Sequence, residues 1–305
     1  MSETSKGILA MVAACVIWGF VPLYYALLSH VPPLEVLSHR TLWSLVLFGV
    51  LLSVQGRLGE LPRILLTWRG FLLVSVAGLM VSTNWGIFIL SVQIGKVVES
   101  SLGYFIFPLV AVVLGRLVYG ERLSRVKWLS VAIATTAVVV LTAGLGVAPW
   151  ISLILAFTFG LYGVIKKGLE AGPVVSVTGE VLVLAPMAAI WLAGVHFGGW
   201  EGLTGHNAAV FGHDLQDSLV LIGSGLTTAG PLILFSYASR RLDLSTVGLL
   251  QYINPSLQFL CAVAILGEAV TPWHMLAFPM IWLALAIYSA EAFRQDRASR
   301  RAARS

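Results

Sequence analysis

The feature that most constrains this chain is a series of apolar blocks, each about 17 to 22 residues long. A helix of that length crosses the roughly 30 Å of hydrocarbon in a bilayer. Apolar residues make up 58% of the 305 residues and charged residues 11%, whereas a soluble domain is about half apolar and a quarter charged. Because the apolar residues are gathered in blocks, we expect a polytopic membrane protein.

Ten such blocks are present, and each is predicted to be a transmembrane helix. Lipid cannot satisfy free backbone groups, so only helices and closed barrels span a membrane. The blocks do not alternate apolar and polar residues as barrel strands do. The predicted spans cover residues 7–28, 34–54, 70–92, 99–118, 127–144, 149–166, 174–195, 218–238, 245–267 and 272–291. We interpret the first as a retained helix and not as a signal peptide.

The placement of lysine and arginine predicts the orientation. With the connections counted alternately from an inside N-terminus, 16 of the 19 basic residues fall inside, including those of a basic tail over residues 293–305. Cytoplasmic connections carry such an excess, so both termini are predicted to be cytoplasmic. The net charge of +5 is then explained by basic residues that set the orientation and face anionic lipid. No nucleic-acid partner is expected.

The two halves of the chain repeat one pattern. At an offset of 147 residues, Pro108 aligns with Pro255, and Gly-Glu at 120–121 aligns with Gly-Glu at 267–268. At an offset of about 140, Arg40 aligns with Glu180 as a charge inside a span. Five helices per repeat is an odd number, so the halves must be inverted, which is an architecture of secondary transporters. The predicted fold is an all-α integral membrane protein with two inverted five-helix repeats, residues 1–145 and 146–292.

Local signals at two helix ends have a structural interpretation. Glu121 and Glu268 each come directly before a predicted helix, where a carboxylate suits the positive end of the helix dipole. Thr271 and Pro272 fit an N-cap followed by proline at the first helical position.

Four segments resemble a known family. They read TNWGIFILSVQIGKVVESSLGYFIFPL (83–109), RRLDLSTVGLLQYINPSLQF (240–259), SHVPPLEVLSHRTLWS (29–44) and FGLYGVIKK (159–167). These segments resemble the RarD branch of the EamA-type drug/metabolite transporter superfamily. The resemblance implies ten helices in two EamA repeats, placement in the cytoplasmic (inner) membrane, and export or exchange of small metabolites. One departure is Phe107, where the family usually has asparagine before the proline, whereas Asn254 precedes Pro255 in the second half.

Charged residues inside spans are the first candidates for a site. An ionisable residue there costs about 2.5 to 3.5 kcal/mol on insertion scales and indicates function by default. We hypothesise that Arg40 binds an anionic group such as a carboxylate, and that Glu180 binds a cationic group or carries a coupling proton. A buried ion pair or capped charge that fixes the repeat interface is the structural alternative. His39 points to another part of the helix than Arg40, and its imidazole suits proton coupling.

Polar and aromatic residues at matching depth complete the candidate site. They are Asn84, Trp85, Tyr104, Gln251, Tyr252 and Asn254. Each is explained equally well by helix–helix hydrogen bonding, but as a cluster they favour a substrate site. Pro108 and Pro255 each remove a backbone hydrogen bond, so we expect them to kink two helices and to act as hinges.

No catalytic residue, metal site or cofactor is predicted. Cys15 and Cys261 are interpreted as packing residues, and the histidines of the outer connection 196–217 lack ligand spacing, which indicates a solvated loop. A membrane enzyme would need a nucleophile–base pair, HExxH or intramembrane aspartates, and the sequence has none. The predicted function is alternating-access transport of a small molecule, with or without proton coupling. A lipid-handling or receptor-like protein is the alternative, since it requires no motif.

Overall fold

The computed structural model describes residues 3–120, 123–200, 209–242, 246–247 and 250–302 of the chain. Within these residues the structure is helical, and its β-structure is limited to an isolated bridge between Phe211 and Asp214. Eight helices of the described part are long and apolar enough to cross a membrane. The prediction of an all-α membrane protein is confirmed at this level.

The long elements match eight of the predicted spans. They are α1 (Glu3–Ala26), α2 (Pro33–Val54), α4 (Trp68–Gln93), α5 (Val97–Tyr119), α6 (Arg125–Leu145), α8 (Pro173–Phe197), the segment of α9 (Leu215–Gly223) and α10 (Leu226–Ser239), and α13 (Pro272–Ala302). The shorter elements are α3 (Glu60–Leu65), α7 (Trp150–Lys167), and α12 (Ile253–Leu260), which continues into the π-helical turn η1 (Cys261–Ile265).

Capping residues fix where several helices begin and end. The side chains of Thr67, Ser124 and Asp214 each accept a hydrogen bond from the backbone N–H three residues later, which starts α4, α6 and α9. Gly120 and Gly146 end α5 and α6 in the left-handed conformation, with φ of 67° and 68°, where glycine has no steric penalty.

The predicted N-cap at Thr271 is also present. Its hydroxyl oxygen accepts from the backbone N–H of His274 at 3.4 Å, and Pro272 is the first residue of α13. Proline at that position loses no hydrogen bond, because the first N–H of a helix has no intrahelical partner.

The predicted eighth span is broken into α9 and α10 at Ser224 and Gly225. A Cβ atom on Gly225 would lie 2.7 Å from the carbonyl carbon of Trp43 and 2.9 Å from the nitrogen of Ser44. Glycine therefore allows this segment to approach the backbone of α2 closely. The segment stays apolar across the break, so the apolar pattern alone does not reveal it.

The two candidate hinge prolines lie in different surroundings. Pro255 is the third residue of α12, and the chain turns at Gln251 and Tyr252 just before that helix. A proline ring clashes with the carbonyl four residues earlier, which here belongs to Gln251. By contrast, α5 continues as one helix through Pro108. The hinge role of both residues stays a prediction.

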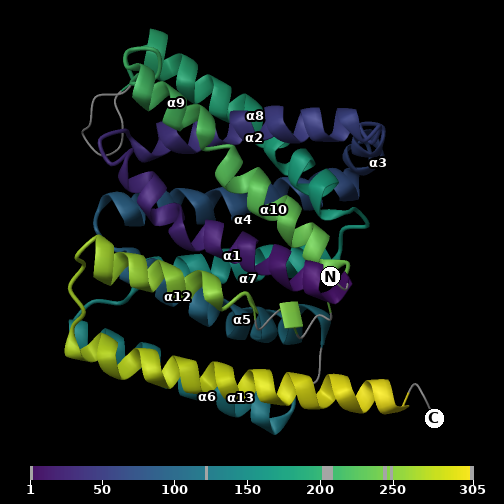
Figure 1. Cartoon of the computed structure of the whole chain (residues 1–305), viewed down its shortest axis with the longest axis vertical. Helices are drawn as coiled ribbons and strands as arrows, with labels where there is room; N and C mark the ends of the chain where they lie inside the picture. The colour runs from purple at the N-terminus through teal and green to yellow at the C-terminus, as the bar shows by residue number, and fades with distance from the viewer. Residues whose placement is uncertain (1–2, 121–122, 201–208, 243–245, 248–249, 303–305) are drawn as a thin grey trace.

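Helices from the two halves of the chain pack against each other throughout the bundle. Helix α1 packs on α10 and α12, and α7 packs on α4 and α5. The pairs α2–α8, α5–α12 and α6–α13 complete the arrangement, with α6 and α13 together at one edge (Figure 1). A core of buried apolar residues joins α1, α4, α5, α6, α7 and α13.

The start of α1 and the end of α13 lie toward the same side of the bundle, together with α3 (Figure 1). An ion pair fixes the first turn of α1 there, because Arg241 Nε, just after α10, lies 2.8 Å from Glu3 Oε2. This side carries the connection between α2 and α4 and the end of α10.

Candidate functional site

Arg40 is buried at a point where four helices meet. It lies on α2 and is 5% exposed. Its Nε donates a hydrogen bond to the hydroxyl of Thr228 on α10 at 2.8 Å. Its guanidinium carbon lies 4.1 Å from the ring centroid of Trp85 on α4 and 5.7 Å from that of Tyr25 on α1. Both rings offer the cation a negatively polarised face.

The charge of Arg40 has no protein counter-ion in the described part of the chain. No carboxylate there forms an ion pair with its guanidinium, and the hydrogen bond to Thr228 uses only Nε. A buried cation without a partner is unfavourable, and a guanidinium fork matches the geometry of a carboxylate or phosphate. The cluster of Arg40, Trp85, Tyr25 and Thr228 is therefore suited to hold an anionic group.

Glu180 has a cation of its own. Its side chain, on α8, is fully buried and lies 2.7 Å from Lys166 Nζ on α7. The hydroxyls of Ser176 and Tyr162 donate to the same carboxylate at 3.0 Å and 3.1 Å. This geometry is a buried ion pair whose carboxylate also accepts hydrogen bonds, and its cation is Lys166.

Two sequence signals could have indicated this pair. Tyr162 and Lys166 are four residues apart on α7, and so are Ser176 and Glu180 on α8. Residues at that spacing share one face of a helix. In the sequence, Lys166 is the first charge of a predicted inside connection. In the structure its side chain extends back along α7 to the buried carboxylate of Glu180, as long basic side chains can do.

Aromatic side chains connect the surroundings of Arg40 with those of Glu180. Successive ring centroids lie 6.2 Å apart for Tyr25 and Phe88, 5.8 Å for Phe88 and Tyr104, and 6.0 Å for Tyr104 and Phe159. Phe159 then stacks on Tyr162 at 5.8 Å. These rings come from α1, α4, α5 and α7, so an aromatic path runs between the two charged centres.

Two of the candidate residues, Asn84 and Tyr104, lie together. The Tyr104 hydroxyl donates to Asn84 Oδ1 at 2.9 Å. Asn84 Nδ2 donates to the carbonyl of Leu155 at 3.0 Å and to the hydroxyl of Thr158 at 3.1 Å. The side chain is 1% exposed, so in this conformation it joins α4, α5 and α7 by hydrogen bonds.

The candidates from the second half lie around the start of α12. Gln251, Tyr252 and Asn254 are at the start of α12, which packs on α1 and α5. Asn254 Oδ1 accepts a hydrogen bond from Gln258 at 3.1 Å. In the described residues, none of the three forms a hydrogen bond with Arg40. Tyr252 nevertheless packs against the same buried core as Tyr25, Phe88 and Tyr104.

His39 faces away from Arg40, as expected from its neighbouring position on the helix. Its ring packs on Phe211 with centroids 4.5 Å apart. Its Nε2 is buried and has no hydrogen-bond partner among the described residues. His39 thus belongs to the contact between α2 and the segment before α9.

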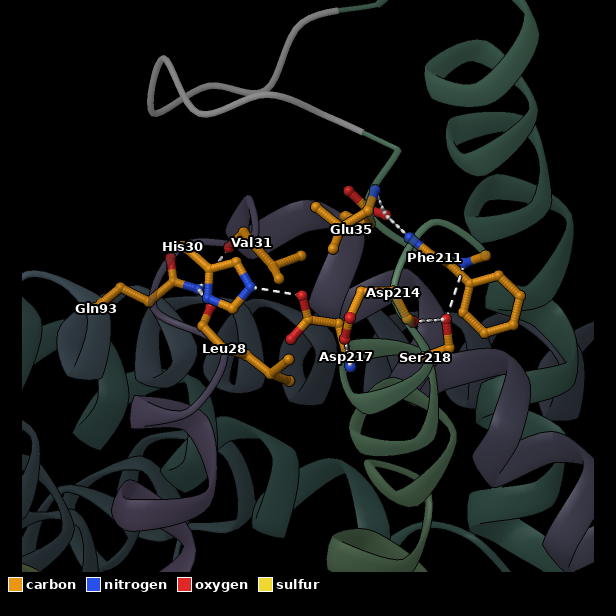
Figure 2. Close-up of polar contacts among 11 residues, drawn as sticks. Leu28, His30, Val31, Glu35, Gln93, Phe211, Asp214, Asp217 and Ser218 are labelled. Carbon is orange, nitrogen blue, oxygen red and sulfur yellow. Dashed lines mark hydrogen bonds and ion pairs between the residues drawn. The ribbon is translucent and has the colours of Figure 1, made fainter.

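A buried carboxylate holds that segment in place (Figure 2). Glu35, in the first turn of α2, accepts hydrogen bonds from the backbone N–H groups of Ala209, Val210 and Phe211 at 3.1, 2.9 and 3.3 Å. His30 Nε2 lies 2.8 Å from Asp217 Oδ2, and Figure 2 draws this contact as well. The predicted loop 196–217 is therefore attached to α2 and to the α1–α2 connection, while its residues Glu201 and His206 lie outside the described part.

Glu268 makes a similar clamp, and this corrects one prediction. It was expected to act on the helix that follows it. Instead its carboxylate accepts from the N–H groups of Val97 and Val98 at 2.7 and 2.8 Å, at the start of α5. The start of α13 already has Thr271 as its cap, so the carboxylate is free to bind a different helix. Its repeat partner, Glu121, lies outside the described residues.

Comparison with known proteins gives consistent results. The model of the EamA-like transporter family matches residues 5–143. The chain is 41% identical over 299 residues to a protein named RarD in Streptomyces exfoliatus, covering 98% of this chain and 93% of that protein. It is 38% identical over 300 residues to a protein named "Uncharacterized transporter" in Vibrio cholerae, covering 98% and 97%.

A solved crystal structure has the same fold. Its TM-score with this chain is 0.59 at 19% sequence identity, and the match covers 95% of this chain and 99% of the other. The similarity therefore extends over nearly the full length in both sequence and structure.

Proposed function

This chain belongs to the EamA-like transporter family, in its RarD branch, and from that premise we propose that it exports or exchanges a small metabolite or drug-like molecule that carries an anionic group. It is a multi-pass membrane transporter of the drug/metabolite superfamily. The observation that carries the proposal is the buried guanidinium of Arg40, which has Thr228 and Trp85 as neighbours but no carboxylate among the described residues.

The aromatic path supports a substrate with an apolar or aromatic body. Rings from four helices extend from Tyr25 to Tyr162, and aromatic side chains provide large apolar contact areas. An anionic end would bind at Arg40 while the body of the molecule packs along these rings. Small-molecule sites combine a mostly apolar lining with a few placed polar groups in this way.

The transporter would have ten spans in two inverted repeats, with both termini cytoplasmic in the inner membrane. The eight long helices, together with α7 and the α12–η1 segment, give that number. Each span of the first half has a counterpart five spans later in the chain. When every span is replaced by its counterpart, the packing of α1 on α10 and α12 becomes the packing of α7 on α4 and α5. The same replacement leaves the pairs α2–α8, α5–α12 and α6–α13 unchanged, which supports the repeat boundaries 1–145 and 146–292.

Alternating access follows from this arrangement. The two repeats would rock about a site near the midplane, with the helices around Pro108 and Pro255 as gates. A proton would be carried by Glu180, because its buried carboxylate accepts a hydrogen bond from Tyr162 at one end of the aromatic path.

The experiment begins with a stabilisation screen of anionic and neutral metabolites on the purified protein. Hits are then tested for uptake into proteoliposomes with and without a proton gradient. We expect Arg40→Gln to lower the affinity for an anionic hit at least about tenfold, because a charge-assisted hydrogen bond contributes about 1.5 to 3 kcal/mol. Arg40→Lys should recover part of the loss, since it keeps the charge without the planar fork.

Arg69→Gln is the matched control, because Arg69 is an exposed arginine at the start of α4. It should leave transport unchanged. Wild-type affinity and transport in a folded Arg40→Gln variant would contradict the proposed anion site.

A further inference from the structure

A cavity of about 530 Å³ lies at the ends of α2, α8 and α10, well away from Arg40 along the same two helices α2 and α10. Its lining is mixed, with apolar residues, arginines and three other polar side chains. The lining residues are Leu51, Gln55, Arg57, Val174, Ile233, Ser236, Tyr237, Arg240 and Arg241. None of these described residues is acidic, so the cavity has a positive lining.

Two of the three arginines are already paired. Arg57 Nε and Nη2 donate to Glu60 at 2.6 and 3.0 Å, and these bonds hold the pKa of Glu60 below its usual range. Arg241 Nε donates to Glu3, and its guanidinium carbon lies 3.6 Å from the ring centroid of Tyr237. The carboxylates neutralise much of these two charges from outside the cavity.

Two donors of the lining are unused in the described part of the chain. The side chain of Arg240, which is exposed, has no hydrogen-bond or ion-pair partner there. The hydroxyl oxygen of Ser236 is buried and has no partner there. Ser236 is in the last turn of α10, and Arg240 directly follows that helix. A guanidinium and a hydroxyl four residues apart form a suitable pair for a phosphate oxygen.

The apolar part of the lining indicates that the ligand has a hydrocarbon part as well as an anionic group. Leu51, Val174 and Ile233 come from α2, α8 and α10, and Ile233 is 40% exposed. These side chains lie on the membrane-spanning helices, next to the ends that carry the arginines. A molecule with both a phosphate and a hydrocarbon chain would satisfy the two parts of the cavity together.

We propose that this cavity binds the headgroup phosphate of an anionic phospholipid from the cytoplasmic leaflet, with an acyl chain along Val174 and Ile233. Basic residues at a membrane surface attract anionic lipid, and the phosphate would bind Arg240 and Ser236. The inference rests on the proposed cytoplasmic position of this end of the bundle. It does not depend on the substrate or on Arg40, so it can fail while the transport proposal stands.

The test uses the full-length protein in detergent and measures lipid binding by native mass spectrometry. The probes are dioleoyl phosphatidylglycerol, dioleoyl phosphatidylcholine and water-soluble glycerol 3-phosphate. We expect phosphatidylglycerol to bind at least about tenfold more tightly than the other two. Arg240→Gln should remove most of this preference. Ile233→Trp, which fills the cavity without changing its charge, should weaken phosphatidylglycerol binding as well.

Arg69→Gln removes one exposed positive charge outside the cavity and should keep the preference. Equal losses in Arg69→Gln and Arg240→Gln would overturn the proposal in favour of a general charge effect. Equal binding of phosphatidylglycerol and phosphatidylcholine would overturn it too. Glycerol 3-phosphate binding as tightly as the lipid would show a site for soluble phosphates instead.

Discussion

The buried carboxylate of Glu180 forms an ion pair with Lys166 at one end of the proposed transport path. Removing one partner leaves the other charge buried and unpaired, which costs about 3 to 5 kcal/mol, whereas replacing both is often neutral. This asymmetry separates a structural role from a role in coupling. A structural pair can be replaced without loss of transport, but a proton carrier cannot.

The first prediction uses that asymmetry. Glu180→Gln and Lys166→Met should each lower the free energy of unfolding by about 3 kcal/mol, and the double variant should lose less than the sum. Thermal unfolding in detergent measures the stabilities, and proteoliposome uptake under a proton gradient measures transport. A stable double variant that still shows gradient-driven uptake would refute the coupling role of Glu180.

At the residue scale, the sequence identifies isolated charges but not their partners. Arg40 and Glu180 stand out because each is a charge inside an apolar block, and the structure buries both. Which cation reaches Glu180 depends on how α7 and α8 pack, and Lys166 lies at the end of its block. Partner choice is therefore a tertiary property that the apolar pattern does not contain.

At the scale of elements, the contact between α2 and the start of α10 depends on one glycine. Gly225 lies against the backbone of Trp43 and Ser44, and backbone atoms cannot move aside as a side chain can. The same two helices carry Arg40 and Thr228. A change in their separation would therefore also disturb the proposed anion site.

Gly225→Ala should destabilise the protein by about 1 to 3 kcal/mol, because an overpacked contact forces backbone shifts. It should also weaken binding of an anionic substrate. Gly230→Ala is the matched control in α10, since a Cβ there meets no atom within 4 Å, and it should be neutral or stabilising by up to about 1 kcal/mol. Equal stability of the two variants, by thermal unfolding, would contradict the role given to Gly225.

Helix positions were largely predictable, whereas breaks within apolar segments were not. The cap at Thr271 is visible in the sequence and lies where expected. The break at Ser224 and Gly225 is hidden because the segment stays apolar across it. The break coincides with the close approach of Gly225 to the backbone of α2, and hydropathy does not register such a contact.

At the scale of the whole molecule, the proposed inverted repeat would explain why the two halves pack through exchanged partners. Two copies of opposite orientation place equivalent helices at equivalent contacts, as with α1 on α10 and α7 on α4. In the proposed topology α4 crosses the membrane between Arg69 and Lys96, so these two residues would lie on opposite sides. Lys96 precedes α5, and Arg69 is in the first turn of α4.

The last prediction tests this topology. A cysteine introduced as Lys96→Cys should react with a membrane-impermeant maleimide in intact cells, because its connection is predicted to face outward. A cysteine at Arg69 should react only after the membrane is permeabilised. The native Cys15 and Cys261 are both buried, so they should contribute little background. Labelling of Arg69→Cys in intact cells would place this connection outside, and with it the cavity near Arg57 and Arg240. Such a result would contradict both the orientation and the lipid site, while leaving the fold and the anion site at Arg40 unaffected.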